Sequence, residues 1–150
     1  MLSVQQALNY YMDSLDEVQE LKDTCTSCQM ERDNFTIVNR VADFPEVLMI
    51  TLKRWAEAGV AGGILDTVAV DLELLCVKTS YRLQSVVNHL GASIDHGHYV
   101  TIARHPTSQH EWWLYDDEDS RPAMPAEVMS CTSLYGLGPM HSYVLFYERV

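Results

Sequence analysis

The chain has 150 residues, 47% of them hydrophobic, and 21 acidic against 10 basic side chains give a formal net charge of −11 with histidine neutral. This composition is typical of one globular domain and not of a disordered chain. Phosphate-backbone binding depends on clustered lysine and arginine, so the acidic balance argues against a nucleic-acid partner. No apolar run approaches the roughly 20 residues that a membrane helix needs, which argues against a membrane protein.

The first twenty residues are expected to be helical. Ser3 with Gln6, and Ser14 with Glu17, have the spacing of a capping box, which favours two short helices over one long helix. Apolar residues at helical spacing predict a buried stripe, formed by Leu15, Val18 and Leu21.

Beyond Cys28 the pattern changes from helix to strand. β-branched residues predict a strand over 34–41, and the nearly continuous apolar run 47–52 predicts a central strand buried on both faces. A glycine-containing loop is expected over 56–66, then one or two short strands within 67–75. The remaining expected elements are strands over 81–89, 99–103, 112–115 and 143–147, a polar loop over 91–97, a turn over 105–110, and a helix over 126–130 behind Pro125.

Alternation in the strand over 81–89 puts four side chains on one face of a sheet: Tyr81, Leu83, Ser85 and Val87. The whole order is helices followed by mainly antiparallel strands, and no segment repeats. The sequence therefore predicts the α+β fold class.

The pair Cys25-x-x-Cys28 has the spacing at which two thiolates in a turn can bind one zinc ion. Two thiolates are half of a structural site, and the other cysteines, Cys76 and Cys131, are isolated in the sequence. A zinc half-site and an unmetallated turn are equally compatible with these residues. A thioredoxin-like redox role is less favoured because no βαβ pattern surrounds the pair. Four cysteines without a secretory leader indicate a reducing, intracellular compartment, cytoplasmic or nuclear.

Gly97-His98-Tyr99 lies where a polar loop meets a strand, and Asp116 follows His98 by eighteen residues. A histidine base needs an acceptor that orients its second ring nitrogen, and two strands joined by a turn would place Asp116 beside His98. On chemistry alone His96 is an equal candidate, and most such pairings in proteins are structural. The other histidines are expected in loops or at the surface: His89, His105, His110 and His141.

Four stretches together resemble the ubiquitin-specific protease family, also called ubiquitin carboxyl-terminal hydrolases. FPEVLMITLKRW (44–55) is similar to the strand before that family's catalytic histidine, and YRLQSVVNHLGASIDHGHYVTIAR (81–104) is similar to its histidine box. WWLYDD (112–117) resembles its aspartate motif, and YVLFYER (143–149) resembles its closing strand. The four motifs stand in the family's order and cover almost the whole chain.

The resemblance implies a papain-like cysteine protease fold and hydrolysis of isopeptide or peptide bonds at the C-terminus of ubiquitin, with ubiquitin and ubiquitinated proteins as partners. It matches His98 to the general base and Asp116 to the residue that orients it, with Asp117 at a neighbouring acidic position. It also matches Cys25 and Cys28 to the second half of a four-cysteine structural zinc site, and it implies no catalytic cofactor.

The family's nucleophile stands in an Asn-x-Gly-x-x-Cys box upstream, which this sequence lacks, as it lacks the first half of the zinc site. Residues 1–150 are therefore expected to be the C-terminal half of the catalytic domain, inactive in isolation. The alternatives are a non-catalytic ubiquitin-binding module derived from the family and a small zinc-binding interaction domain. Acidic residues near His98, such as Asp95, would either guide the basic tail of ubiquitin or serve as ordinary solubilising charge, the favoured interpretation.

Overall fold

A computed structural model describes residues 2–15, 19–37, 39–54, 67–93, 96–129 and 140–150. The elements in chain order are β1 (Leu2–Ser3), α1 (Val4–Leu15), β2 (Gln19–Thr24), β3 (Glu31–Ile37), β4 (Val47–Thr51), β5 (Val68–Ala69), β6 (Glu73–Cys76), β7 (Thr79–Ser93), β8 (His96–His105), β9 (Ser108–Asp116), β10 (Asp119–Ala123), α2 (Pro125–Met129) and β11 (Met140–Arg149).

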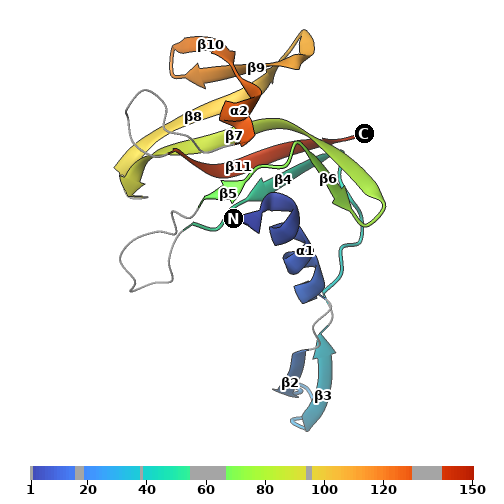
Figure 1. The fold of residues 1–150 in the computed structure, drawn as a ribbon. Coiled ribbons are helices and arrows are strands. Elements are labelled where there is room, and N and C mark those ends of the chain that lie inside the picture. The colour runs from blue at the N-terminus through green and yellow to red at the C-terminus, as the bar shows by residue number, and fades with distance from the viewer. Residues whose placement is uncertain (1, 16–18, 38, 55–66, 94–95, 130–139) are drawn as a thin grey trace.

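One antiparallel sheet of seven strands dominates the molecule (Figure 1). Its strands run in the order β10-β9-β8-β7-β11-β4, and β6 pairs with the first part of β7. β1 and β5 form a short parallel pair, and β2 and β3 form a separate hairpin that extends away from the large sheet (Figure 1). The predicted α+β class, with mainly antiparallel strands, is confirmed. No helix in the described segments is long and apolar enough to span a bilayer.

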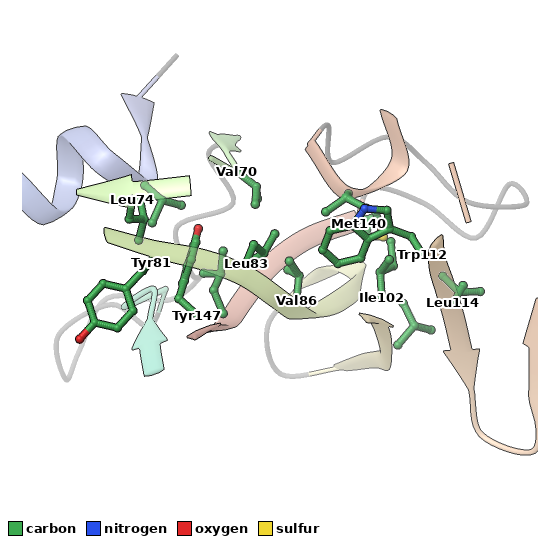
Figure 2. Packing of buried hydrophobic residues seen from close by; sticks show 14 of the residues in the cluster. Val70, Leu74, Tyr81, Leu83, Val86, Ile102, Trp112, Leu114, Met140 and Tyr147 are labelled. Carbon is green, nitrogen blue, oxygen red and sulfur yellow. The ribbon is translucent and has the colours of Figure 1, made fainter. Parts of the chain in front are cut away.

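The core lies on one face of β7 and its neighbours (Figure 2). Tyr81 and Leu83 have no exposed surface, but the predicted alternation does not continue to Ser85 and Val87, and Val86 is the next fully buried residue. Ser85 lies opposite Phe146 and Leu83 lies opposite Tyr147, so β7 carries one extra residue between these pairs. This bulge exchanges the two faces of the strand, which alternation alone does not predict.

The prediction that β4 is buried on both faces is wrong for the part of the chain that the structure describes. There β4 pairs with β11 only, at the edge of the large sheet. Leu48 and Ile50 pack against the core, whereas Val47 and Met49 are 56% and 60% exposed. The apolar run therefore belongs to a strand with one apolar face open.

The N-terminal segment holds one described helix instead of two. The capping box at its start is confirmed, because the Ser3 N–H donates to Gln6 Oε1 at 3.0 Å and the Gln6 N–H donates to Ser3 Oγ at 3.3 Å. The expected second helix is wrong where it can be checked, since Leu21 lies in β2, paired with Phe35. Val18 and Glu17, also part of that prediction, lie outside the described residues.

Two histidines expected in loops or at the surface are buried in the large sheet. His89 on β7 is 4% exposed, and His141 on β11 is 5% exposed and lies directly opposite it. Burial disfavours the charged form of an imidazole and lowers the pKa of both side chains. Both are therefore neutral parts of the sheet at physiological pH.

Leu83→Ala should lower the free energy of unfolding by about 2–5 kcal/mol, because the fully buried side chain leaves a cavity in the core of the sheet. Leu75→Ala is the matched control, since Leu75 is 56% exposed, and its effect should stay within about 0.5 kcal/mol. Urea unfolding measures both changes. Equal losses in the two variants would contradict this placement of the core.

Candidate active site

His98 and Asp116 lie on neighbouring strands of the large sheet, near the start of β8 and at the end of β9. β8 and β9 are antiparallel, with Thr101 opposite Tyr115, so the beginning of one strand meets the end of the other. His98 Nε2 lies 2.5 Å from Asp116 Oδ1. The two strands thus bring the side chains together as their spacing in the sequence suggests.

A tight turn follows Asp116 and leads into β10. Asp117 has φ 49°, a left-handed conformation that aspartate tolerates better than most residues. The turn brings Asp117 Oδ2 to 3.9 Å from His98 Nε2, so two carboxylates face the same imidazole. His96 lies on the same strand as His98 but is exposed and opposite Ser93, away from this pair in register.

The surroundings of His98 stabilise its imidazolium form relative to a free imidazole. Its pKa is raised above the ordinary value of 6.5, mainly by the hydrogen bond to Asp116 and further by the charges of Asp117 and Asp116, while burial opposes the shift more strongly than either charge alone supports it. In the neutral ring the contact at Nε2 selects the tautomer, because an N–H there donates to Asp116 and leaves Nδ1 with a free lone pair. The side chain of His98 is 41% exposed, so a reacting group can reach it.

His98, Asp116 and Asp117 are also the one set of three potential metal-ligating side chains found together in the described ranges. Their ligand atoms lie within 4.8 Å of one another. The hydrogen bond between His98 Nε2 and Asp116 Oδ1 is an arrangement that fits acid–base chemistry.

Cys25 and Cys28 lie in the turn between β2 and β3. The Gln29 N–H donates to the Cys25 carbonyl oxygen at 2.8 Å, and Gln29 itself has φ 59°. Hydrogen bonds from the backbone of Cys28 and Ser27 lower the pKa of Cys25. The turn therefore favours a thiolate, the form in which cysteine binds zinc, and both thiols are accessible.

Cys76 ends β6, is 3% exposed and packs in the core, and burial raises its pKa. A buried thiol with a raised pKa is a poor nucleophile. Cys131 and Asp95 lie outside the described residues.

One residue that the sequence assigned to the surface lies directly behind this site. The ring of His89 packs against Gly97, the neighbour of His98. The motif His89-Leu90-Gly91 precedes the site in the sequence, but nothing in its pattern indicates that the ring turns toward Gly97.

A family model described as ubiquitin carboxyl-terminal hydrolase matches residues 18–147. The chain belongs to the ubiquitin carboxyl-terminal hydrolase family. It is 31% identical to ubiquitin carboxyl-terminal hydrolase 2 of Gallus gallus over 137 residues, which is 85% of this chain and 35% of that protein. It is 30% identical to ubiquitin carboxyl-terminal hydrolase Usp2 of Drosophila melanogaster over 139 residues, 84% of this chain and 13% of that protein. The chain thus spans about a third or less of the length of these relatives.

Solved structures show the same fold. The Ubp8/Sgf11/Sus1/Sgf73 module of SAGA bound to ubiquitin aldehyde contains a chain that matches with a TM-score of 0.64 at 19% identity, over 99% of this chain and 34% of that one. An essential yeast splicing factor matches with a TM-score of 0.58 at 17% identity, over 75% of this chain and 27% of that one. The described sheet is therefore the mainly antiparallel part of a papain-like fold, as the family resemblance implied.

Titration of the His98 ring by NMR should give a midpoint above 6.5, because Asp116 and Asp117 both favour the imidazolium. Asp116→Asn removes the charge of the hydrogen-bond acceptor and should move the midpoint most of the way back. Asp117→Asn is the matched control with a smaller effect, since its carboxylate is 3.9 Å from Nε2 and exposed. A midpoint that Asp116→Asn leaves unchanged would contradict the described geometry.

Proposed function

We propose that this chain supplies the general base and its orienting carboxylate to a cysteine-type deubiquitinase. The observation that carries the proposal is the 2.5 Å contact between His98 Nε2 and Asp116 Oδ1, which leaves Nδ1 free and the ring accessible. Membership of the hydrolase family gives this pair its chemical context. The substrates are isopeptide and peptide bonds at the C-terminus of ubiquitin.

In this mechanism Nδ1 of His98 takes the proton of a cysteine thiol. A free thiol with a pKa near 8.5 is only a few per cent ionised at neutral pH, so a histidine partner raises its reactivity. The thiolate attacks the terminal carbonyl carbon of ubiquitin, and the imidazolium returns its proton to the leaving amine. The thioester that remains is hydrolysed when Nδ1 takes a proton from water, which releases ubiquitin and the thiol.

Asp116 orients the ring throughout and stabilises the imidazolium, and it keeps its own negative charge. Asp117 adds to the local negative potential from the turn. Both carboxylates act through His98 and make its imidazole a stronger base.

The nucleophile in this proposal belongs to an upstream part of the catalytic domain, so residues 1–150 alone have no hydrolase activity. The sequence contains no Asn-x-Gly-x-x-Cys box, and Cys76 is buried in the core. The chain spans 34% of the matched chain in the SAGA module. Ubiquitin and ubiquitinated proteins are the proposed partners, and a thiol nucleophile suits a reducing compartment, cytoplasmic or nuclear.

A fluorogenic amide of ubiquitin tests the catalytic assignment. Joined to an upstream half that carries the Asn-x-Gly-x-x-Cys box, the chain should hydrolyse the amide, and His98→Ala should lower kcat/KM by about 10²–10⁴ because the general base is lost. His96→Ala, two residues away on the same strand, should stay within a few-fold of the parent. Hydrolysis of the amide by residues 1–150 alone, or full activity of the joined chain with His98→Ala, would contradict the proposal.

Cys25 and Cys28 are proposed to supply two of the four thiolates of a structural zinc site. The lowered pKa of Cys25 and the exposure of the turn support this assignment. The ion would hold the tip of the β2–β3 hairpin and take no part in the reaction.

Titration with cobalt(II), a spectroscopic substitute for zinc, tests the assignment in the joined chain, because the upstream half would carry the other two thiolates. A thiolate-to-cobalt charge-transfer band should appear and should be lost in Cys25→Ser. Cys76→Ala should keep the band, because Cys76 is buried in the core and away from the turn. A band that survives in Cys25→Ser, or no band in the parent chain, would rule out a metal at this pair.

A non-catalytic ubiquitin-binding module is the second candidate. The match to an essential yeast splicing factor supports it, because that protein has a similar fold and is known by a role in splicing. The two candidates differ in one result. Both candidates predict that the chain binds ubiquitin. Only the catalytic function predicts that the joined chain hydrolyses the fluorogenic amide and that this hydrolysis depends on His98.

A further inference from the structure

His98 projects from a stretch of β8 whose backbone is not fixed by a regular ladder. Leu90 lies opposite His98, but the next pair along the two strands is Ser93 with His96, so β7 carries an extra residue here. A bulge breaks the regular hydrogen bonds of a sheet and lets the chain bend. Side-chain packing must therefore help to hold the segment that carries the base.

The ring of His89 provides that packing. A Cβ added to Gly97 would lie 2.6 Å from His89 Cε1, and closer still to Nε2 and to the Leu90 carbonyl oxygen. A Cβ added to Gly91, whose φ is +149°, would lie 3.2 Å from the same Cε1 atom. Two glycines thus make room for one imidazole under the bulge.

His89 is itself held firmly. It pairs with Tyr99 on β8 and with His141 on β11, so its backbone lies between two strands. Its ring contacts the ring of Tyr99 with centroids 5.0 Å apart, and Tyr99 contacts Tyr143 at 5.8 Å. His89 is 4% exposed, and its Nδ1 is buried with no hydrogen-bond partner. A hydrogen bond at Nδ1 therefore does not account for the placement of this ring, which leaves its packing.

We propose that His89 is a positioning residue for the base: its ring fills the space beneath Gly97 and fixes the backbone from which His98 reaches Asp116. That His98 acts as a base rests on the proposed function. The packing of His89 against Gly97 does not depend on it. His89 touches no reacting atom in this scheme, since it acts through Gly97 on the face of the sheet opposite the His98 side chain.

The acid–base titration of His98 in the 150-residue chain tests this inference without any measurement of turnover. His89→Ala should lower the NMR midpoint of His98 by about half a pH unit or more toward 6.5, because a loosened backbone weakens the hydrogen bond to Asp116. His141→Ala is the matched control: it removes an equally buried imidazole from the next strand, on the far side of His89 from Gly97. It should leave the midpoint unchanged.

An unchanged midpoint in a folded His89→Ala variant, or equal shifts in both variants, would overturn the positioning role. If His89→Ala does not give the dispersed amide spectrum of a folded chain, it is replaced by His89→Gln. This substitution leaves a smaller cavity and keeps a polar side chain. No shift in His89→Gln relative to His141→Gln would then count against the role. A joined chain without deubiquitinase activity would refute the proposed function and leave this titration result standing.

Discussion

The pairing of β7 with its neighbours is the constraint on which the rest of the structure depends. This strand has 15 residues, long enough to pair with β11 along one edge and with both β6 and β8 along the other. Its side chains supply the centre of the core, including the fully buried Tyr81, Leu83 and Val86. β6, β8 and β11 pair with it directly, and β4, β9 and β10 are placed through β11 and β8.

The candidate site depends on the same strand at its far end. β7 sets the position of β8, and β8 sets the position of β9, so His98 and Asp116 meet through two successive ladders. Antiparallel neighbours place the start of one strand beside the end of the next, which explains how residues eighteen apart come within 2.5 Å. The regular ladder stops beside the base, where the bulge between Leu90 and Ser93 leaves packing to hold the backbone.

Local patterns in the sequence predict most strands of the large sheet, the α+β class and the nearness of His98 and Asp116, because alternation and short turns act over a few residues. They fail where the outcome depends on distant partners. The run 47–52 has the composition of a central strand, but its neighbours decide that Met49 is exposed. The faces of β7 change at a bulge that only β11 reveals. Burial of His89 depends on glycines at 91 and 97 making room, which no periodicity describes.

The β2–β3 hairpin differs from the sheet in how its stability is supplied. In the described ranges these strands pair only with each other, and the hairpin extends away from the main body (Figure 1). An isolated two-stranded hairpin is at best marginally stable in water. Its amide protons should therefore exchange with solvent through local opening, independently of the protected amides of β7 and β11. A metal ion bound at Cys25 and Cys28 would slow amide exchange in this hairpin alone. The hairpin and the large sheet would then open as separate units, and only the opening of the hairpin would depend on metal concentration.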